Sequence, residues 1–99
     1  IILLDVMLPG LDGEPMKVST TKARDAITEA LTVIRARVAY GRRLEGLTPW
    51  ERLAVDLAEV QADVIEGAVP GYMRQATARA LGRRALALLA FTAWLEVPR

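Results

Sequence analysis

Four carboxylates recur in the middle of the chain at intervals of three, four and three residues: Asp56, Glu59, Asp63 and Glu66. This spacing places them on one face of a helix. Carboxylate oxygens are the ligands that a hard cation such as Mg²⁺ prefers. The central pair, Glu59 and Asp63, is therefore a candidate Mg²⁺ site. The alternative is a solvated or ion-paired face without chemistry, as charge runs usually are.

Other charged residues could complete such a site. Asp25 and Glu29, four residues apart on an upstream segment, could add metal ligands or pair with neighbouring bases. Arg79, Arg83 and Arg84 form the densest basic group, and guanidinium forks suit phosphate oxygens. These arginines are candidate phosphate-binding residues for a nucleotide. Alternatively, they dock against the acidic face within the chain or across a dimer.

The composition limits which chemistry is available. The chain of 99 residues has no histidine and no cysteine, which removes the commonest general base, thiolate metal sites and disulfides. It is 53% hydrophobic and 25% charged with a net charge of +1, a balance that argues against disorder and gives no general reason to expect nucleic-acid binding. The length fits one domain. We nominate no catalytic residue.

No segment has the pattern of a membrane anchor. The longest apolar run, from Ala85 to Leu95, is interrupted only by Thr92 and is about half of the ~20 residues that a transmembrane helix needs. The first residues are apolar but lack the basic start of a signal peptide and include Asp5. We therefore expect no membrane association and a cytoplasmic location.

Charges are strongly segregated along the chain. Residues 1–16 carry three acids and no base, and residues 17–43 carry seven bases and two acids. Residues 44–69 carry one base and six acids, whereas residues 70–99 carry five bases and one acid. An acidic segment between two basic ones is typical of antiparallel helices that select their neighbours by charge.

The clearest element is a helix over residues 49–66. Thr48 can cap it, Pro49 suits its first position, Glu51 completes a capping box, and Gly67 follows as a stop. Apolar residues then recur with a helical period, which predicts the face that the helix buries. That predicted core face consists of Trp50, Leu53, Leu57, Val60 and Val64.

Two more helical segments flank this one. The first starts after Ser19 or Thr20 and ends at Gly41 or Gly46, and its apolar face is Ala23, Ile27, Ala30, Leu31, Ile34 and Val38. The last covers residues 71–96, either as one long helix or as two helices broken near Gly82. Its end, from Ala85 to Leu95, is apolar on all sides, which is typical of a buried helix or a subunit interface.

The first fifteen residues differ from this pattern. The run IILLDV, followed by Pro9 and Gly10, is typical of a buried β-strand, yet no second strand candidate follows. We predict an all-α fold, a bundle of three or four helices in residues 16–99. Residues 1–15 form a short apolar extension or remnant. Because so small a core is marginal alone, we expect a homo-oligomer.

Residues 1–13, IILLDVMLPGLDG, resemble the third strand and following loop of response-regulator receiver domains. The resemblance implies that Asp5 accepts a phosphoryl group and that Pro9 and Gly13 shape the adjoining loop. Receiver domains also need an acidic pair from the first strand for Mg²⁺, and a Thr or Ser together with a Lys from later strands. The helical remainder of this chain offers no strands to carry the later pair.

Residues 48–96 resemble the all-α, MazG-like nucleotide pyrophosphohydrolases. The segments in question are TPWERLAVDLAEVQADVIEG and RRALALLAFTAWLE. The resemblance implies Mg²⁺-dependent hydrolysis of nucleoside triphosphates, with Glu59 at a metal-ligand position. Ala58 and Ala62 stand at two other ligand positions, and Arg83 and Arg84 replace acids of the second element, so the resemblance points to a divergent or inactive member.

Three functions follow from these patterns. The first is a divergent pyrophosphohydrolase domain that holds Mg²⁺ at Glu59 and Asp63. The second is a non-catalytic helical module for oligomerisation or interaction, which would bury Phe91, Trp94 and Leu95 between chains. The third is a phosphorelay fragment that uses Asp5. The sequence leaves open whether the chain is an enzyme.

Overall fold

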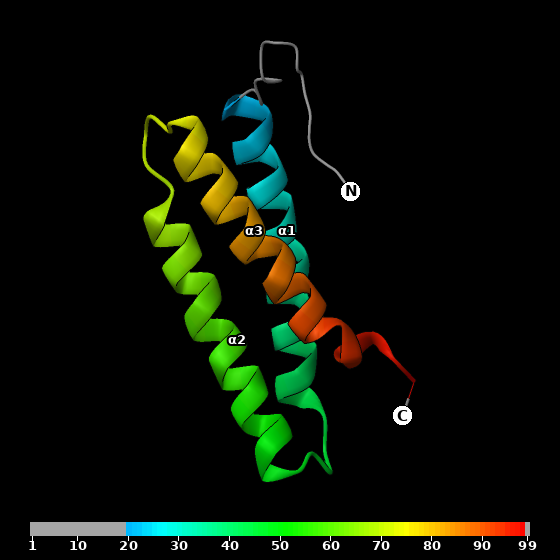
Figure 1. The fold of residues 1–99 in the computed structure, drawn as a ribbon. Coiled ribbons are helices and arrows are strands. Elements are labelled where there is room, and N and C mark those ends of the chain that lie inside the picture. The colour runs from blue at the N-terminus through cyan, green and yellow to red at the C-terminus, as the bar shows by residue number, and fades with distance from the viewer. Residues whose placement is uncertain (1–19, 99) are drawn as a thin grey trace, which may run out of the picture.

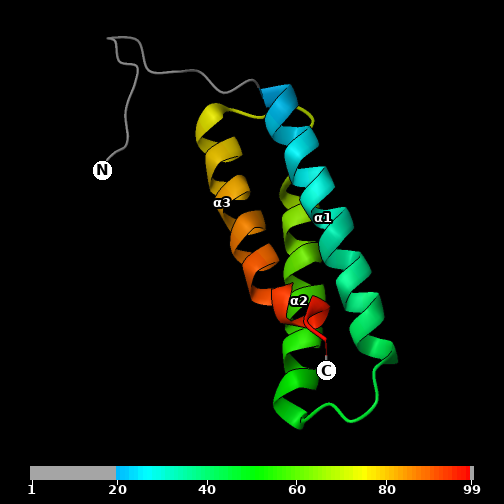
Figure 2. The same ribbon diagram turned by 90° about the vertical axis from the view of Figure 1, so that its right-hand side faces the viewer.

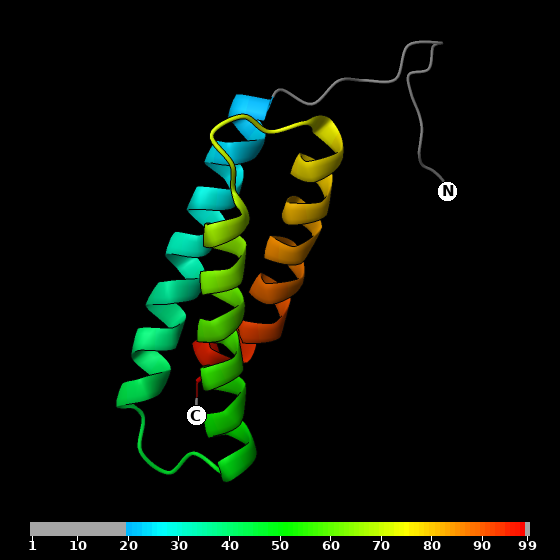
Figure 3. The ribbon, with the colours of Figure 1, turned by 90° about the vertical axis from the view of Figure 1, so that its left-hand side faces the viewer.

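A computed structural model describes residues 20–98, which form three α-helices and a closing 3₁₀ turn, with the second helix antiparallel to the other two (Figure 1). The elements are α1 (Thr20–Arg43), α2 (Pro49–Ala68), α3 (Gln75–Thr92) and η1 (Ala93–Glu96). Each helix packs against the other two (Figures 2 and 3). This confirms the predicted all-α bundle for the described part of the chain. The strand predicted for the first residues and the boundary after residue 15 lie outside it.

The start of α2 is fixed by the predicted capping box. The Thr48 hydroxyl accepts a hydrogen bond from the Glu51 backbone N–H at 3.1 Å, and the Glu51 carboxylate accepts one from the Thr48 N–H at 2.9 Å. Pro49 occupies the first turn, where its missing N–H costs nothing. The helix continues through Gly67 to Ala68, two residues beyond the predicted end.

The turn before α2 depends on two glycines. Gly41 lies buried in the last turn of α1, where an added Cβ would come within 3.0 Å of both Leu95 Cδ2 and Val55 Cγ2. Gly46 has a φ of 80°, in the left-handed region that glycine adopts without steric cost. The helix ends at Arg43, between the two predicted stops.

The last helix is a single one. It begins at Gln75, later than predicted, and runs through Gly82 without a break. The preceding turn is held to the start of α1, since Arg24 Nη2 donates a hydrogen bond to the Gly71 carbonyl at 2.9 Å. Met73, buried in the core, anchors the same turn.

The core lies along the axis between the three helices. On α1 the predicted face is confirmed, with Ile34 fully buried and Ala23 packed at its edge. Helix α3 contributes to the core a row of side chains that recur every three or four residues. The buried residues of the helices are Ile27, Ala30, Leu31, Ile34, Val38 and Gly41 on α1, Val55, Ala58, Ala62 and Ile65 on α2, and Ala78, Leu81, Ala85, Leu88 and Thr92 on α3.

The predicted core face of α2 is wrong. The helix buries Val55, Ala58, Ala62 and Ile65, which we call the inner stripe, and exposes Trp50, Leu53, Leu57, Val60 and Val64, which we call the outer stripe. The two alanines of the inner stripe are completely inaccessible, so their small side chains let α2 approach its neighbours closely. A helix in a three-helix bundle buries one side, and here the inner stripe occupies it.

The end of the chain is clamped to α1 by Arg37. Its Nη1 donates to the Leu89 carbonyl at 2.7 Å and to the Thr92 hydroxyl at 3.2 Å, and its Nη2 pairs with Glu96 at 3.0 Å. Leu95 thereby lies in the core of its own chain and Trp94 packs against that core. Of the three side chains expected between chains, Phe91 alone is exposed.

Candidate functional site

The four predicted carboxylates of α2 lie on its flank toward α1 and pair with two arginines. Arg35 Nη2 contacts Asp63 at 2.9 Å and also bonds Glu66. Arg42 Nη1 contacts Asp56 at 3.0 Å, while its Nη2 bonds Glu59. The arginines are seven residues apart, as are the two acid pairs, so antiparallel helices bring both sets into register.

The neighbouring carboxylates raise the pKa values of both arginines. Hydrogen bonding to Asp63, then to Glu66, raises the pKa of Arg35 above its ordinary value. Hydrogen bonding to Glu59 is the largest cause of the raised pKa of Arg42. All these side chains are partly solvated, so the pairs set register and orientation more than they stabilise the fold.

The predicted Mg²⁺ site at Glu59 and Asp63 stays a hypothesis. Within residues 20–98 no three carboxylates converge as a metal site would require, and Asp25 and Glu29 do not join Glu59 and Asp63. A cation at Glu59 and Asp63 would have to displace two guanidinium groups. The pyrophosphohydrolase hypothesis stays a prediction, and the phosphoryl acceptor Asp5 lies outside the described residues.

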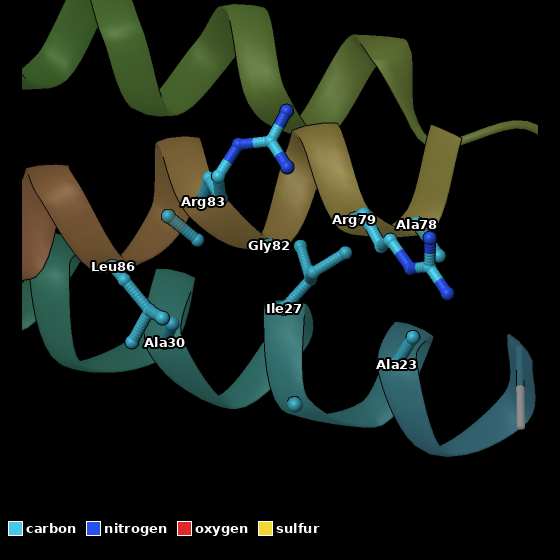
Figure 4. A pocket seen from close by; sticks show the side chains of 10 residues that line it. Ala23, Ile27, Ala30, Ala78, Arg79, Gly82, Arg83 and Leu86 are labelled. Atoms are coloured by element: carbon cyan, nitrogen blue, oxygen red, sulfur yellow. The ribbon is translucent and has the colours of Figure 1, made fainter. Parts of the chain in front are cut away.

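The predicted phosphate-binding arginines are divided between two sides of α3. Arg79 and Arg83 line a groove of about 350 Å³ between α1 and α3, and their guanidinium groups point in different directions (Figure 4). Arg84 lies on the other side, where α3 meets α2. In the described part of the chain the acidic face pairs with Arg35 and Arg42, and none of these three arginines reaches it. The prediction that they dock on that face within the chain is therefore wrong.

The groove between α1 and α3 is lined mainly by small apolar residues. Figure 4 shows Ala23, Ile27 and Ala30 of α1 opposite Ala78, Gly82 and Leu86 of α3. Hydrogen-bonding groups in it come from the two arginines at its rim. The groove therefore has few groups that could form hydrogen bonds with a ligand or react with one.

The outer stripe is the feature that sequence reasoning misplaced. Its five members are spaced by three, four, three and four residues, the spacing of a coiled-coil seam. Their exposed fractions run from 45% to 79%, the highest being that of Trp50. Figure 3 shows α2 in front of the other two helices, so that one side of it is free of both. The sequence itself indicates that α2 exposes an apolar row, because it contains two such rows and only one can face the core.

One member of the outer stripe borders a groove between α2 and α3. Leu57 lines a groove of about 420 Å³ together with Ile65 of α2 and with Leu88 and Phe91 of α3. Phe91 is half exposed. Gln61 and Arg84 supply the polar groups at the edge of the groove. The groove therefore brings one member of the outer stripe, Leu57, together with the exposed Phe91 of α3.

Comparison with known proteins adds no assignment. No family model matches the chain, and no curated protein or solved structure gives a significant match. Among residues 20–98, none of the helices combines the length and the apolar character needed to cross a bilayer.

Proposed function

We propose that this chain is a non-catalytic helical module whose function is to assemble copies of itself through the outer stripe of α2. The observation that supports this proposal is the exposure of five large apolar side chains at coiled-coil spacing on one side of one helix. Single exposed apolar residues are ordinary on protein surfaces. A regular row of them is typical of an interface.

The size of the surface suits association. Taking reference areas on the order of 200 Å² per side chain, the exposed fractions of the outer stripe and Phe91 amount to about 600 Å². The largest apolar patch of an ordinary monomer is roughly 300–600 Å². Stable interfaces bury about 800 Å² per partner. The stripe with its polar rim therefore comes close to one complete interface.

The charges around the stripe are compatible with self-association. In a symmetric dimer the same surface faces itself, so unpaired like charges would repel. The outer stripe has no charged member, and the acids on the flank of α2 are already paired with Arg35 and Arg42 of the same chain. Two copies can therefore approach without bringing unpaired acids together.

Analytical ultracentrifugation tests the proposal. We expect the mass of the wild-type chain to rise with concentration above that of one copy. Leu57→Glu places a charge in the middle of the stripe and should hold the chain at the mass of one copy, with helix content unchanged by circular dichroism. The matched control is Leu86→Glu, which places the same charge on an exposed leucine of the α1–α3 groove.

Two results would contradict the proposal. One is a wild-type chain that has the mass of a single copy throughout the accessible concentrations. The other is association that Leu86→Glu disrupts and Leu57→Glu does not, because that would place the interface on the α1–α3 side.

A further inference from the structure

Gly67 has no role within its own chain that requires glycine. It lies inside α2 and does not have the positive φ for which glycine is selected. Apart from its two chain neighbours and the adjacent backbone of its own helix, no atom lies within 4 Å of the position that a Cβ would occupy. Glycine weakens a helix relative to alanine, and Gly41, by contrast, is explained by its contacts with Leu95 and Val55. The space above Gly67 is therefore open to something outside the chain.

Gly67 continues the outer stripe by one step. It follows Val64 by three residues, so the six positions from Trp50 to Gly67 form an unbroken alternation of three and four. In an antiparallel pair of such helices the first position of one opposes the last position of the other. The opposed residues are then Trp50 with Gly67, Leu53 with Val64, and Leu57 with Val60.

We infer that the outer stripe binds the outer stripe of a second copy in antiparallel orientation, with Trp50 of each copy packed over Gly67 of the other. This inference rests on the proposed function and specifies its geometry. The largest side chain of the row meets the position without a side chain, and the leucines meet valines. The two-fold axis passes between Leu57 and Val60, so every contact occurs twice.

The parallel alternative fits the same residues poorly. It would place Trp50 against Trp50 at one end and Gly67 against Gly67 at the other, which crowds one end and leaves a void at the other. The area is also close to what a pair of copies needs, since each stripe without Phe91 exposes about 540 Å² and two stripes bury roughly 1,100 Å² in total, just below the value of about 1,200 Å² at which standard interfaces begin. Antiparallel pairing thus uses the whole stripe together with the polar residues beside it.

Disulfide cross-linking tests the orientation directly, because the chain has no cysteine of its own. In the full-length Leu53→Cys/Val64→Cys variant, oxidation should produce covalent dimers. The two positions lie about 16 Å apart along one helix, too far for a bridge within the chain, since bridged Cα atoms lie within about 7 Å. Each single variant should fail to cross-link alone, and an equal mixture of the two should give the mixed dimer.

The contact between Trp50 and Gly67 is tested by Gly67→Leu. This change adds apolar area in open space and a better helix former, so the single copy should fold at least as well. In the inferred dimer the new side chain collides with Trp50 at both ends, and self-association should weaken by at least about tenfold. Adding Trp50→Ala should restore association relative to Gly67→Leu alone, because the large and small residues are then exchanged.

The outcomes separate this inference from the proposed function. A wild-type chain that never associates contradicts both. Association that Leu57→Glu abolishes, together with cross-linking of the Leu53→Cys single variant, contradicts only the antiparallel orientation. Association that Gly67→Leu strengthens contradicts the Trp50 contact and leaves a stripe that binds through apolar area alone.

Discussion

Replacing Arg37 by methionine should destabilise the fold more than any other single change of an arginine. Its side chain is only 14% exposed and reaches from α1 to the end of α3, where its Nη1 bonds the Leu89 carbonyl at 2.7 Å. That carbonyl belongs to the last turn of the helix, where a positive charge also interacts favourably with the helix dipole. Methionine keeps the packing of the aliphatic stem and removes the donors.

The expected loss follows from these contacts. A hydrogen bond from a charged donor contributes about 1.5–3 kcal/mol. Two features keep the loss in the lower part of that range. The Leu89 carbonyl retains the Thr92 hydroxyl as a donor, and the buried Nε of Arg37, which has no partner, no longer has to be desolvated. We expect a loss of about 2 kcal/mol and a melting temperature lower by roughly 8–16 °C.

Urea unfolding followed by circular dichroism at 222 nm measures this loss. Every variant must be compared at the same protein concentration, because association stabilises the folded state. The control is Arg35→Met, which should cost clearly less because the Arg35 side chain is 38% exposed. If Arg37→Met costs no more than the control, the clamp between α1 and the end of α3 does not form as described.

Three further predictions concern the same fold. Thr48→Ala removes the hydroxyl that accepts from Glu51 and should lower stability by about 1 kcal/mol in urea unfolding, whereas Thr48→Ser should retain most of it. Gly82→Ala fills open space in a helix and should stabilise the fold by up to about 1 kcal/mol. The added methyl group of Gly41→Ala instead meets Leu95 and Val55, so this variant should be at least about 1 kcal/mol less stable than Gly82→Ala. Equal stabilities of the two variants would contradict the close packing at Gly41. The hydrogen bond from Arg37, and secondly the positive charge of Arg37, lower the pKa of Glu96 in the folded state. This pair therefore stabilises the fold fully above the unfolded pKa of about 4.3, and its contribution is lost as the pH falls through the lower pKa of the folded state. Glu96→Gln should therefore flatten the acid limb of a plot of unfolding free energy against pH, and an unchanged limb would refute the pairing.

Local signals of the sequence predicted the helices well. The capping box at Thr48 depends on residues within one turn, so it needed no knowledge of the tertiary structure. The buried face of α1 was also predictable, because this helix has a single apolar row. The predicted start of α3 is too early, because nothing local marks Gln75 and the turn before it is held by Arg24 of a distant helix.

The orientation of α2 could not be obtained from periodicity. Its sequence has two apolar rows with equivalent spacing, and hydrophobicity alone favours the row with the larger side chains as the core. The row with two alanines is buried instead, since close helix packing depends on the neighbours as well as on hydrophobicity. The equal seven-residue spacings of Arg35 and Arg42 and of the acid pairs contain the missing information, because they require the acidic flank to face α1.

The predicted arginine group shows a related limit. Arg83 and Arg84 are adjacent in the sequence, but neighbouring residues on a helix point about 100° apart. One therefore lines the groove toward α1 and the other the groove toward α2. Density of charge along a sequence does not by itself make a patch on a surface.

The burial of Trp50 is the most direct measure of the outer stripe as an interface. In a Trp94→Phe variant the remaining tryptophan is Trp50, whose fluorescence and accessibility to acrylamide can be followed against protein concentration. We predict emission at shorter wavelength and reduced quenching as the concentration rises, and loss of both changes when Leu57→Glu is added. Emission typical of a solvent-exposed tryptophan, with unchanged quenching at every concentration, would contradict the account.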